Sequence, residues 1–266
     1  MFKVFNDIWR FCLTGIGFAA FGVGALILSV VLFPIFNLFV RDRLQRKKFA
    51  HKAIAKTFYG YVWILRFLRI FDFRFENFDE LNRDENTIVV ANHPSLLDIV
   101  FLGAAIEHCN CIVKDKLLKN FFVKGVIGAA DYIPNDDIEQ FIQLCSERLT
   151  SKDKLVIFPE GTRTTRGKPM KLQRGAANIA LRIQKDIRLV SISLDYPMLT
   201  KEHKWYRIPP MKPTFVIRME EKIIINDYLN NGHSLSINAR LLTEDLQNRL
   251  STNLTKYIED KNDTTQ

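Results

Sequence analysis

A histidine and an aspartate five positions apart, His93 and Asp98, have the side chains needed for proton transfer. Pro94 disfavours the helical region for His93, so the imidazole is predicted to lie on an extended turn that follows the apolar strand 87–91. Ser95 favours a helix N-cap, with Asp98 as the acid of a capping box, which predicts that a helix starts directly afterwards. Asp98 can then accept one imidazole N–H and leave the other nitrogen free as a base. Alternatively, Asp98 only stabilises the helix start and His93 is an ordinary polar residue.

A second polar turn follows the apolar run Lys154–Phe158 and contains Glu160, Gly161, Thr162 and Arg163. Arg163 suits a phosphate or carboxylate in a bidentate way, and an ion pair with Glu160 is the alternative role. Backbone N–H groups of this turn are candidates for stabilising a developing oxyanion, so Gly161 and Thr162 also count as candidates for substrate binding. Ligands of open α/β sheets gather at the carboxyl ends of the strands, so both turns could face one cleft.

The two motifs together resemble the glycerolipid acyltransferases, which include the 1-acylglycerol-3-phosphate acyltransferases and other lysophospholipid acyltransferases. The matching segments are Asn-His-x4-Asp at residues 92–98 and Phe-Pro-Glu-Gly-Thr-Arg at residues 158–163, and the resemblance covers about residues 60–220. In that family the Glu and Arg of the second motif are associated with the glycerol-phosphate part of the acyl acceptor. The resemblance implies this role for Glu160 and Arg163, and it implies a two-helix membrane anchor at the N-terminus.

A His–Asp pair is a base without a nucleophile of its own, which points to a hydroxyl of the substrate as the nucleophile. His93 would take the proton of that hydroxyl as its oxygen attacks an activated acyl carbonyl, and would then protonate the departing thiolate. The sequence has no Gly-x-Ser-x-Gly elbow and no P-loop or Rossmann glycine pattern. We therefore expect acyl transfer from acyl-CoA or acyl carrier protein without a covalent intermediate, a bound cofactor or a metal ion. A lipid hydrolase and a non-enzymatic lipid-binding module are the alternatives.

A third region, Lys114 to Asn135, resembles the acceptor-binding segment of the family, but the Arg that usually closes it is absent. Asp136 and Asp137 stand nearby instead and would repel a phosphate. A different lysophospholipid, a glycolipid or another lipid alcohol therefore stays open as the acceptor. Lys114 could compensate for the missing charge, or be a solvated lysine. Arg174, at the start of a predicted helix, suggests an anion site or a basic surface toward lipid headgroups.

The segment Phe11 to Phe36 contains no charged residue and is long enough to reach across the roughly 30 Å core of a bilayer. A cleaved signal peptide fits less well because the run is long and no small-residue cleavage site follows it. Basic residues come next, and Phe49 to Phe73 is predicted to form an amphipathic helix at the interface. The positive-inside rule then places the main domain in the cytoplasm. Spanning and monotopic insertion both remain open.

Alternating strands and helices after residue 74 predict an α/β fold with a mixed, largely parallel sheet flanked by helices, behind the N-terminal helical membrane anchor. The expected strands are Thr87–Ala91, Asn110–Val113, Lys154–Phe158, Arg188–Leu194 and Thr214–Met219, and the expected helices are Leu96–Ile106, Asp115–Gly128, Asp137–Ser151, Leu172–Gln184 and Leu235–Ile258. The expected parts are an anchor at 1–73, an acyltransferase domain at 74–258 and a polar tail at 259–266. The net charge of +9 favours anionic partners. These are predicted to be the bilayer and a lysophospholipid acceptor, and no nucleic acid is expected.

Overall fold

A seven-stranded sheet forms the centre of the computed structural model, which describes residues 2–81, 83–85, 87–113, 115–134, 138–150, 152–165 and 167–263. Its strands are β1 (Asp72–Glu76), β2 (Thr87–Ala91), β3 (Cys109–Val113), β4 (Ile133–Pro134), β5 (Lys154–Ile157), β6 (Asp186–Leu194) and β7 (Thr214–Ile223). They lie in the order β1-β7-β6-β2-β5-β3-β4. Strands β6 and β7 pair antiparallel, and the other neighbouring strands pair parallel. The predicted mixed, largely parallel sheet is confirmed.

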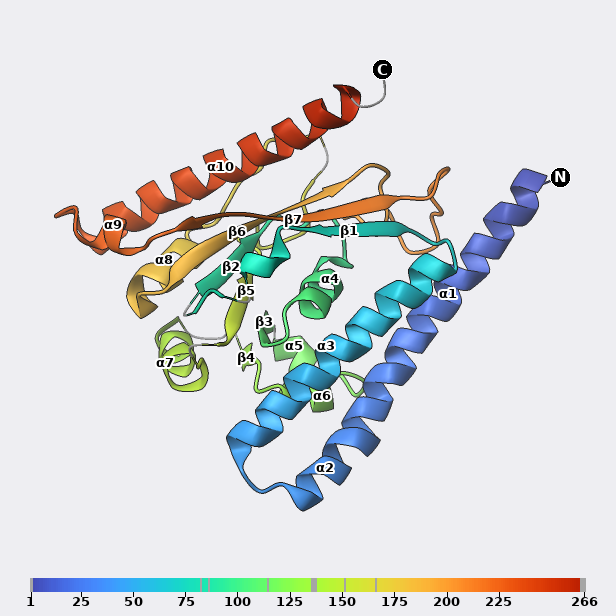
Figure 1. Cartoon of the computed structure of the whole chain (residues 1–266), viewed down its shortest axis with the longest axis horizontal. Coiled ribbons are helices and arrows are strands. Elements are labelled where there is room, and N and C mark those ends of the chain that lie inside the picture. Colours follow the sequence, from blue (N-terminus) through green and yellow to red (C-terminus); the bar gives the residue numbers. More distant parts are fainter. Residues whose placement is uncertain are drawn as a thin grey trace.

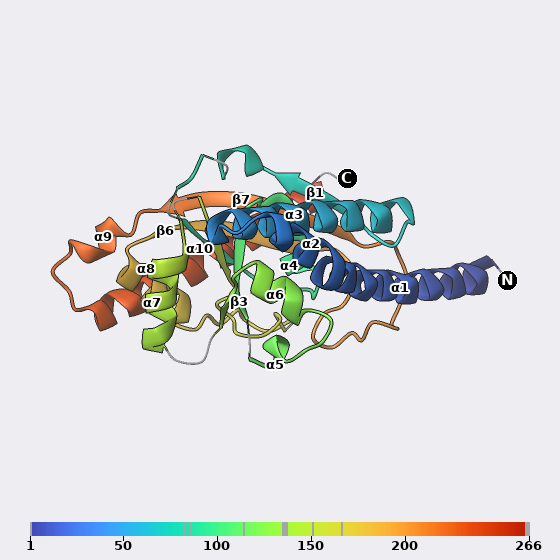
Figure 2. The same ribbon diagram turned by 90° about the horizontal axis from the view of Figure 1, so that it is seen from below.

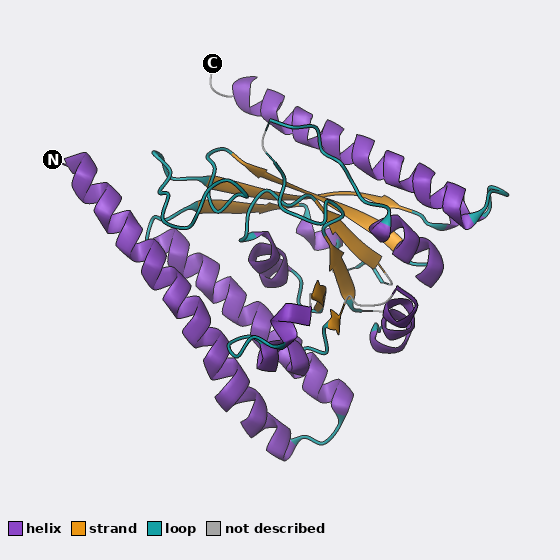
Figure 3. Cartoon of the chain, turned by 180° about the vertical axis from the view of Figure 1, so that it is seen from behind, coloured by secondary structure: helices purple, strands orange, loops and turns teal. Residues whose placement is uncertain are grey.

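Helices cover both faces of this sheet (Figures 1 and 3). The N-terminal helices are α1 (Phe2–Ile27), α2 (Phe33–Phe39) and α3 (Arg43–Phe67); those that follow are α4 (Asp98–Ala105), α5 (Asp115–Leu118), α6 (Lys124–Ala129), α7 (Ile138–Arg148), α8 (Gly175–Ile183), α9 (Asn226–Leu229) and α10 (Leu235–Asp263). A short 3-10 turn spans Phe78–Glu80. Helices α7, α8 and α10 pack on one face, while α4 and the long α1–α3 arm pack on the other.

Strand β2 shows how the sequence builds these two layers. All five of its residues are buried. Because side chains alternate across a sheet, Ile88 and Val90 join the core beneath α8 and α10, while Val89 and Ala91 join the core beneath α4. An uninterrupted apolar run is what a central parallel strand with both faces covered requires.

The apolar N-terminal helix does not end at Pro34. It continues to Phe39 through a π-helical turn at Leu28–Leu32, in which the N–H of Phe33 donates to the carbonyl of Leu28. A proline lacks the N–H for the usual bond and its ring crowds the preceding turn, and one wide turn accommodates both effects. By length and composition, Ile8–Phe39 is a candidate membrane span of 32 residues.

Most of the α1–α3 arm lies along the α/β domain, and the first turns of α1 extend beyond it (Figure 2). Near the start of α1, the Arg10 guanidinium donates to the carbonyl of Pro209 at 2.8 Å. The ring of Phe11 stacks on Trp205 with 5.5 Å between ring centroids. Further along, Leu28 packs in one cluster with Ala130, which follows α6. The arm therefore contacts the domain near both of its ends.

Part of the expected basic flank is used inside the protein. Lys47 is 5% exposed, and its ammonium donates to the carbonyl of Arg148 at 2.6 Å and to Asp153 at 2.9 Å. Arg43 forms an ion pair with Asp131 at 2.9 Å. These contacts attach the start of α3 to the turn after α6, to the end of α7 and to the loop before β5.

Several predicted element boundaries were wrong. The amphipathic helix expected to reach Phe73 ends at Phe67, because the chain turns at Arg69, with φ of 58°, and continues into β1. The helix expected at Asp115–Gly128 is interrupted after Leu118 and resumes as α6. Strand β1 was missed because its first residues were assigned to the amphipathic helix that was expected to reach Phe73.

Candidate active site

His93 and Asp98 meet as the sequence predicts. His93 Nδ1 lies 2.8 Å from Asp98 Oδ2, and the ring is 17% exposed while the carboxylate is fully buried. The same Oδ2 accepts the backbone N–H of Ser95 at 2.7 Å. Since a carboxylate oxygen only accepts, Nδ1 carries the proton and Nε2 keeps a free lone pair.

The predicted capping box is only half formed. The carboxylate of Asp98 returns to the Ser95 N–H, but α4 begins at Asp98, later than expected, and its N-cap Leu97 uses no side-chain bond. The Ser95 hydroxyl accepts the backbone N–H of Leu97 at 3.3 Å and donates to the carbonyl of Met198 at 2.9 Å. Ser95 therefore anchors the turn to the segment after β6, which supports its structural role.

Burial raises the pKa of Asp98 from 3.8 to about 6, against the opposing effect of the hydrogen bond from His93. Asp98 Oδ1 is buried with no hydrogen-bond partner in the described part of the chain. The fold thus holds a carboxylate where ionisation is costly and directs it at the imidazole. Buried, perturbed carboxyl groups of this kind are characteristic of functional sites.

Glu160 supports the histidine turn rather than pairing with Arg163. Its Oε1 accepts the backbone N–H of His93 at 2.9 Å and the hydroxyl of Thr164 at 2.6 Å. The N–H of Thr164 donates in turn to the carbonyl of His93 at 2.7 Å. The two predicted turns are therefore joined side by side at the carboxyl ends of β2 and β5, which are adjacent in the sheet.

Arg163 is held by the backbone beyond β6. Its Nη1 donates to the carbonyls of Leu199 and Thr200 at 2.7 and 2.8 Å. The guanidinium has further N–H groups in a fixed fork, and Arg163 lines the cavity beside His93. Gly161 has φ of +68°, a left-handed conformation that glycine adopts without strain.

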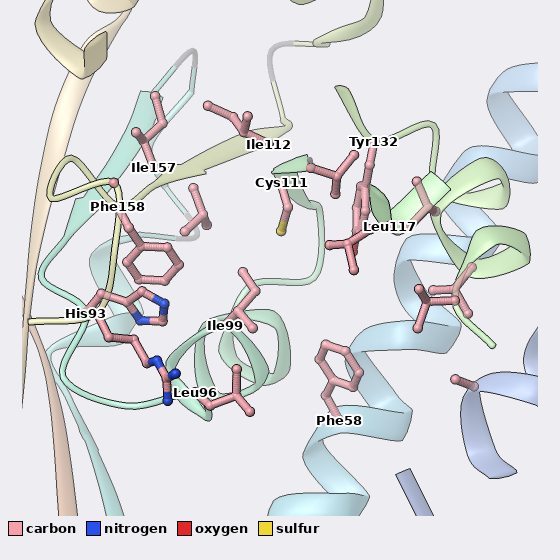
Figure 4. A pocket seen from close by; sticks show the side chains of 18 of the residues that line it. Phe58, His93, Leu96, Ile99, Cys111, Ile112, Leu117, Tyr132, Ile157 and Phe158 are labelled. Atoms are coloured by element: carbon pink, nitrogen blue, oxygen red, sulfur yellow. The ribbon is translucent and has the colours of Figure 1, made fainter. Parts of the chain in front are cut away.

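An apolar cavity of about 830 Å³ opens beside the imidazole (Figure 4). Its walls come from the arm, the sheet and α8: they include Phe21 and Leu28 of the N-terminal helix, Phe58 of α3, Cys111 of β3 and Gly175 of α8. The cavity therefore leads from the imidazole of His93 toward the N-terminal helices α1 and α3.

Three predicted site residues remain, Thr162, Arg174 and Lys114. Thr162 lines the cavity at its exposed rim. Arg174 is exposed at the N-cap of α8, next to lining residues Gln173 and Gly175. Lys114 lies outside the described residues, as do Asn135 and the two aspartates that follow it.

Two features of the site were not predicted. Phe158 stacks on the His93 ring, with 4.2 Å between ring centroids and 19° between ring planes. The amide of Asn92 exchanges two hydrogen bonds with Ile192, at 2.7 and 2.8 Å, and so fastens the histidine turn to β6. Val190 and Ile192 of β6 are buried in the core beneath α4 and are not among the residues that line the cavity.

Comparisons with known proteins agree with this fold. The model of the Acyltransferase family matches residues 72–197. The 1-acyl-sn-glycerol-3-phosphate acyltransferase of Helicobacter pylori is 33% identical over 169 residues, covering 56% of this chain and 71% of the relative. The 1-acyl-sn-glycerol-3-phosphate acyltransferase alpha of Ovis aries is 26% identical over 159 residues, covering 54% and 55%. This chain thus spans about half the length of several curated relatives.

The same architecture occurs in the crystal structure of the 1-acyl-sn-glycerophosphate acyltransferase PlsC from Thermotoga maritima. Its TM-score is 0.73 at 21% identity, with 94% of this chain and 98% of that chain covered. The fold and the site define an α/β protein with a His–Asp pair at the sheet edge. The chain belongs to the glycerolipid acyltransferase family.

Proposed function

We propose that this protein transfers a fatty acyl group from acyl-CoA or acyl carrier protein to a hydroxyl of a lysophospholipid such as 1-acylglycerol-3-phosphate. The observation that carries the proposal is the His93–Asp98 pair at the mouth of an apolar cavity. The pair supplies a positioned base, and the cavity supplies a site for a hydrocarbon chain. A lipid-binding module would need the cavity but not the base.

In the proposed reaction, Nε2 of His93 takes the proton of the acceptor hydroxyl as its oxygen attacks the thioester carbonyl. The Asp98 carboxylate holds the ring in the required tautomer and stabilises the imidazolium that forms. When the tetrahedral intermediate collapses, the C–S bond breaks and the same nitrogen returns the proton to the thiolate. Positioned proton transfer of this kind contributes about 10²–10⁴-fold to the rate.

The cavity is proposed to hold an acyl chain. Its volume of about 830 Å³ is within the range of cavities that enclose small molecules, and its walls are mostly aliphatic and aromatic side chains. Each buried CH₂ stabilises binding by about 0.8 kcal/mol. A chain lying along α1 and α3 would place its carbonyl end near His93.

The polar rim is proposed to bind the headgroup of the acceptor. Arg163 offers the N–H groups that do not contact the backbone carbonyls. Arg174 and the N-terminus of α8 lie close to the same opening, and anions bind favourably at such helix ends. Backbone N–H groups around Gly161 and Thr162 are the proposed donors to the oxyanion, and Lys114 is a further proposed contact.

The arm is proposed to seat the protein on a bilayer. Large apolar side chains are exposed along it, among them Phe39 at 82% and Phe67 at 85%. Exposed apolar surface on this scale marks a membrane or protein contact. Because Arg10 near the start of α1 contacts the domain, the arm would insert from one side of the bilayer. The positive-inside rule favours the cytoplasm as that side.

The test is thiol release from acyl-CoA by the purified full chain, with and without a panel of lysolipids. The proposal predicts release only when an acceptor is added, with lysophosphatidic acid compared against lysophospholipids of other headgroups and a monoacyl glycolipid. Release without any acceptor would identify a thioesterase instead. Turnover with the glycolipid alone would overturn the lysophospholipid assignment while leaving the acyl transfer in place.

A further inference from the structure

A second group of ligand-type side chains lies outside the proposed active site. His51 on α3, His108 just before β3 and Asp153 just before β5 each present one ligand atom, and these atoms lie within 4.8 Å of one another. They stand at the amino ends of β3 and β5, while His93 stands at the carboxyl end of β2. A pocket of about 230 Å³ opens over this His51–His108–Asp153 cluster.

His51 is oriented as a metal-binding histidine. Its Nε2 lies 2.7 Å from the carbonyl of Ala130, so Nε2 carries the proton and Nδ1 keeps the lone pair. Metal-ligating histidines characteristically donate their second ring N–H to a backbone carbonyl or carboxylate in this way. The side chain of His51 is only 1% exposed, yet Nδ1 has no hydrogen-bond partner within the described chain.

Asp153 presents one oxygen to the cluster and fixes the other. Its Oδ2 accepts the ammonium of Lys47 at 2.9 Å and the N–H of Thr150 at 2.7 Å. Its Oδ1 lies 3.9 Å from Nδ1 of His51. A cation placed between these two atoms could bond to both of them.

From this geometry we infer that His51, His108 and Asp153 form a binding site for a divalent transition-metal ion of the Zn²⁺ class. A tetrahedral Zn²⁺ bonded at about 2.0–2.1 Å keeps its ligands roughly 3.3 Å apart. The three side chains would therefore move closer together on binding, and the half-buried His108 lines the open pocket. A solvent molecule in the pocket would complete the coordination.

The surroundings select the type of ion. Mg²⁺ and Ca²⁺ need several oxygen ligands, whereas this cluster offers two imidazoles and one carboxylate, and Lys47, Lys48 and Lys152 line the same pocket. Strong bonds to nitrogen must therefore overcome the repulsion of nearby ammonium groups, which favours Zn²⁺ or a similar late transition metal. The ion would connect α3 directly to the starts of two sheet strands (Figure 1).

The experiment is a Zn²⁺ titration of the full-length, tag-free protein in detergent, in competition with a chromophoric chelator. The site predicts one Zn²⁺ per chain, with affinity reduced at least about tenfold in both His108→Ala and Asp153→Asn. The matched control is His233→Ala, which removes an exposed imidazole in the loop before α10 and should leave the affinity unchanged.

A second measurement separates binding from adventitious contact. Zn²⁺ should raise the melting temperature of the wild type and of His233→Ala, because the ion binds only the folded state, and should not raise that of His108→Ala. The inference is overturned if Zn²⁺ does not bind saturably, or if His108→Ala binds it as tightly as the wild type. Neither result depends on acyl transfer, so the proposed function is tested separately.

Discussion

Replacing Asp98 with asparagine removes the negative charge of the buried carboxyl and keeps almost the same shape. The N–H of Ser95 donates to Oδ2, the same oxygen that accepts His93 Nδ1. An asparagine would therefore place its amide oxygen there, since its NH₂ group would face two donors. The tautomer of His93 is preserved in Asp98→Asn, and the variant isolates the effect of the charge.

The expected loss of activity follows from the change in that hydrogen bond. Hydrogen bonds to a charged group contribute about 1.5–3 kcal/mol, against about 0.5–1.5 for a neutral pair. The imidazolium that forms during the reaction also loses its counter-charge at 2.8 Å. Together these effects correspond to about 2–4 kcal/mol of activation free energy. We expect kcat to fall about 30- to 1,000-fold in Asp98→Asn, with little change in the KM of either substrate.

The free energy of unfolding should change far less. A rise in the Asp98 pKa from 3.8 to about 6 corresponds to a penalty on the order of 3 kcal/mol for holding the ionised carboxyl in the fold. Asparagine removes that penalty but places an unpartnered NH₂ where Oδ1 now lies, at a cost of about 1–3 kcal/mol. The two effects nearly cancel.

The assay is steady-state thiol release at saturating acyl-CoA and lysophosphatidic acid, together with thermal unfolding of the same preparations. Asp98→Ala serves as the comparison, because it loses the charge, the orientation of the ring and the bond to Ser95, and should be both slower and less stable. A kcat near that of the wild type in Asp98→Asn would show that the charge of Asp98 does not contribute to the reaction. A large loss of stability would also refute the prediction, since inactivity would then report unfolding.

Three further predictions follow from the site. Activity should fall as the pH drops through about 6, because the Asp98 carboxyl takes up a proton there. Folding raises this pKa, so the contribution of Asp98 to the free energy of unfolding has the opposite pH dependence and grows as the pH falls. Measurements of kcat and of melting temperature between about pH 5 and pH 8 test both signs. Gly24→Leu places a side chain at the cavity wall, where a Cβ meets nothing within 4 Å. It should lower kcat/KM about fourfold for each CH₂ of the acyl chain that no longer fits. Gly22→Leu, equally open but away from the cavity, is the control, and an equal effect in both variants would contradict the prediction. Arg163→Lys should raise the KM of the lysophospholipid about tenfold with kcat nearly unchanged, because lysine lacks the fork that bonds to the two loop carbonyls and is proposed to bind the phosphate. A loss confined to kcat would contradict this prediction.

The sequence predicted the parts of the site that depend on local geometry. Pro94 and Ser95 determine how the chain turns after β2, so the meeting of His93 and Asp98 could be foreseen from short-range preferences. The five inner strands β2, β3, β5, β6 and β7 were predicted from their apolar runs, whereas the edge strand β1 was missed. The turns that contain His93 and Glu160 were therefore predicted at the correct strand ends.

Contacts between distant segments could not be predicted in the same way. Glu160 was expected to bind substrate or to pair with Arg163, and its bonds to the histidine turn depend on β2 and β5 being neighbours. His51 and His108 showed no partner pattern in the sequence, because their proximity to Asp153 is created by the docking of α3 against the sheet. Such clusters become visible only when the tertiary structure is known.

The most direct test of the central claim is the effect of His93→Ala on acyl transfer with both substrates saturating. If His93 is the general base, kcat falls about 10²–10⁴-fold. The binding of lysophosphatidic acid and the melting temperature stay close to those of the wild type. His233→Ala is the control and should be fully active. A His93→Ala protein that still transfers the acyl group at a near-normal rate would contradict the account.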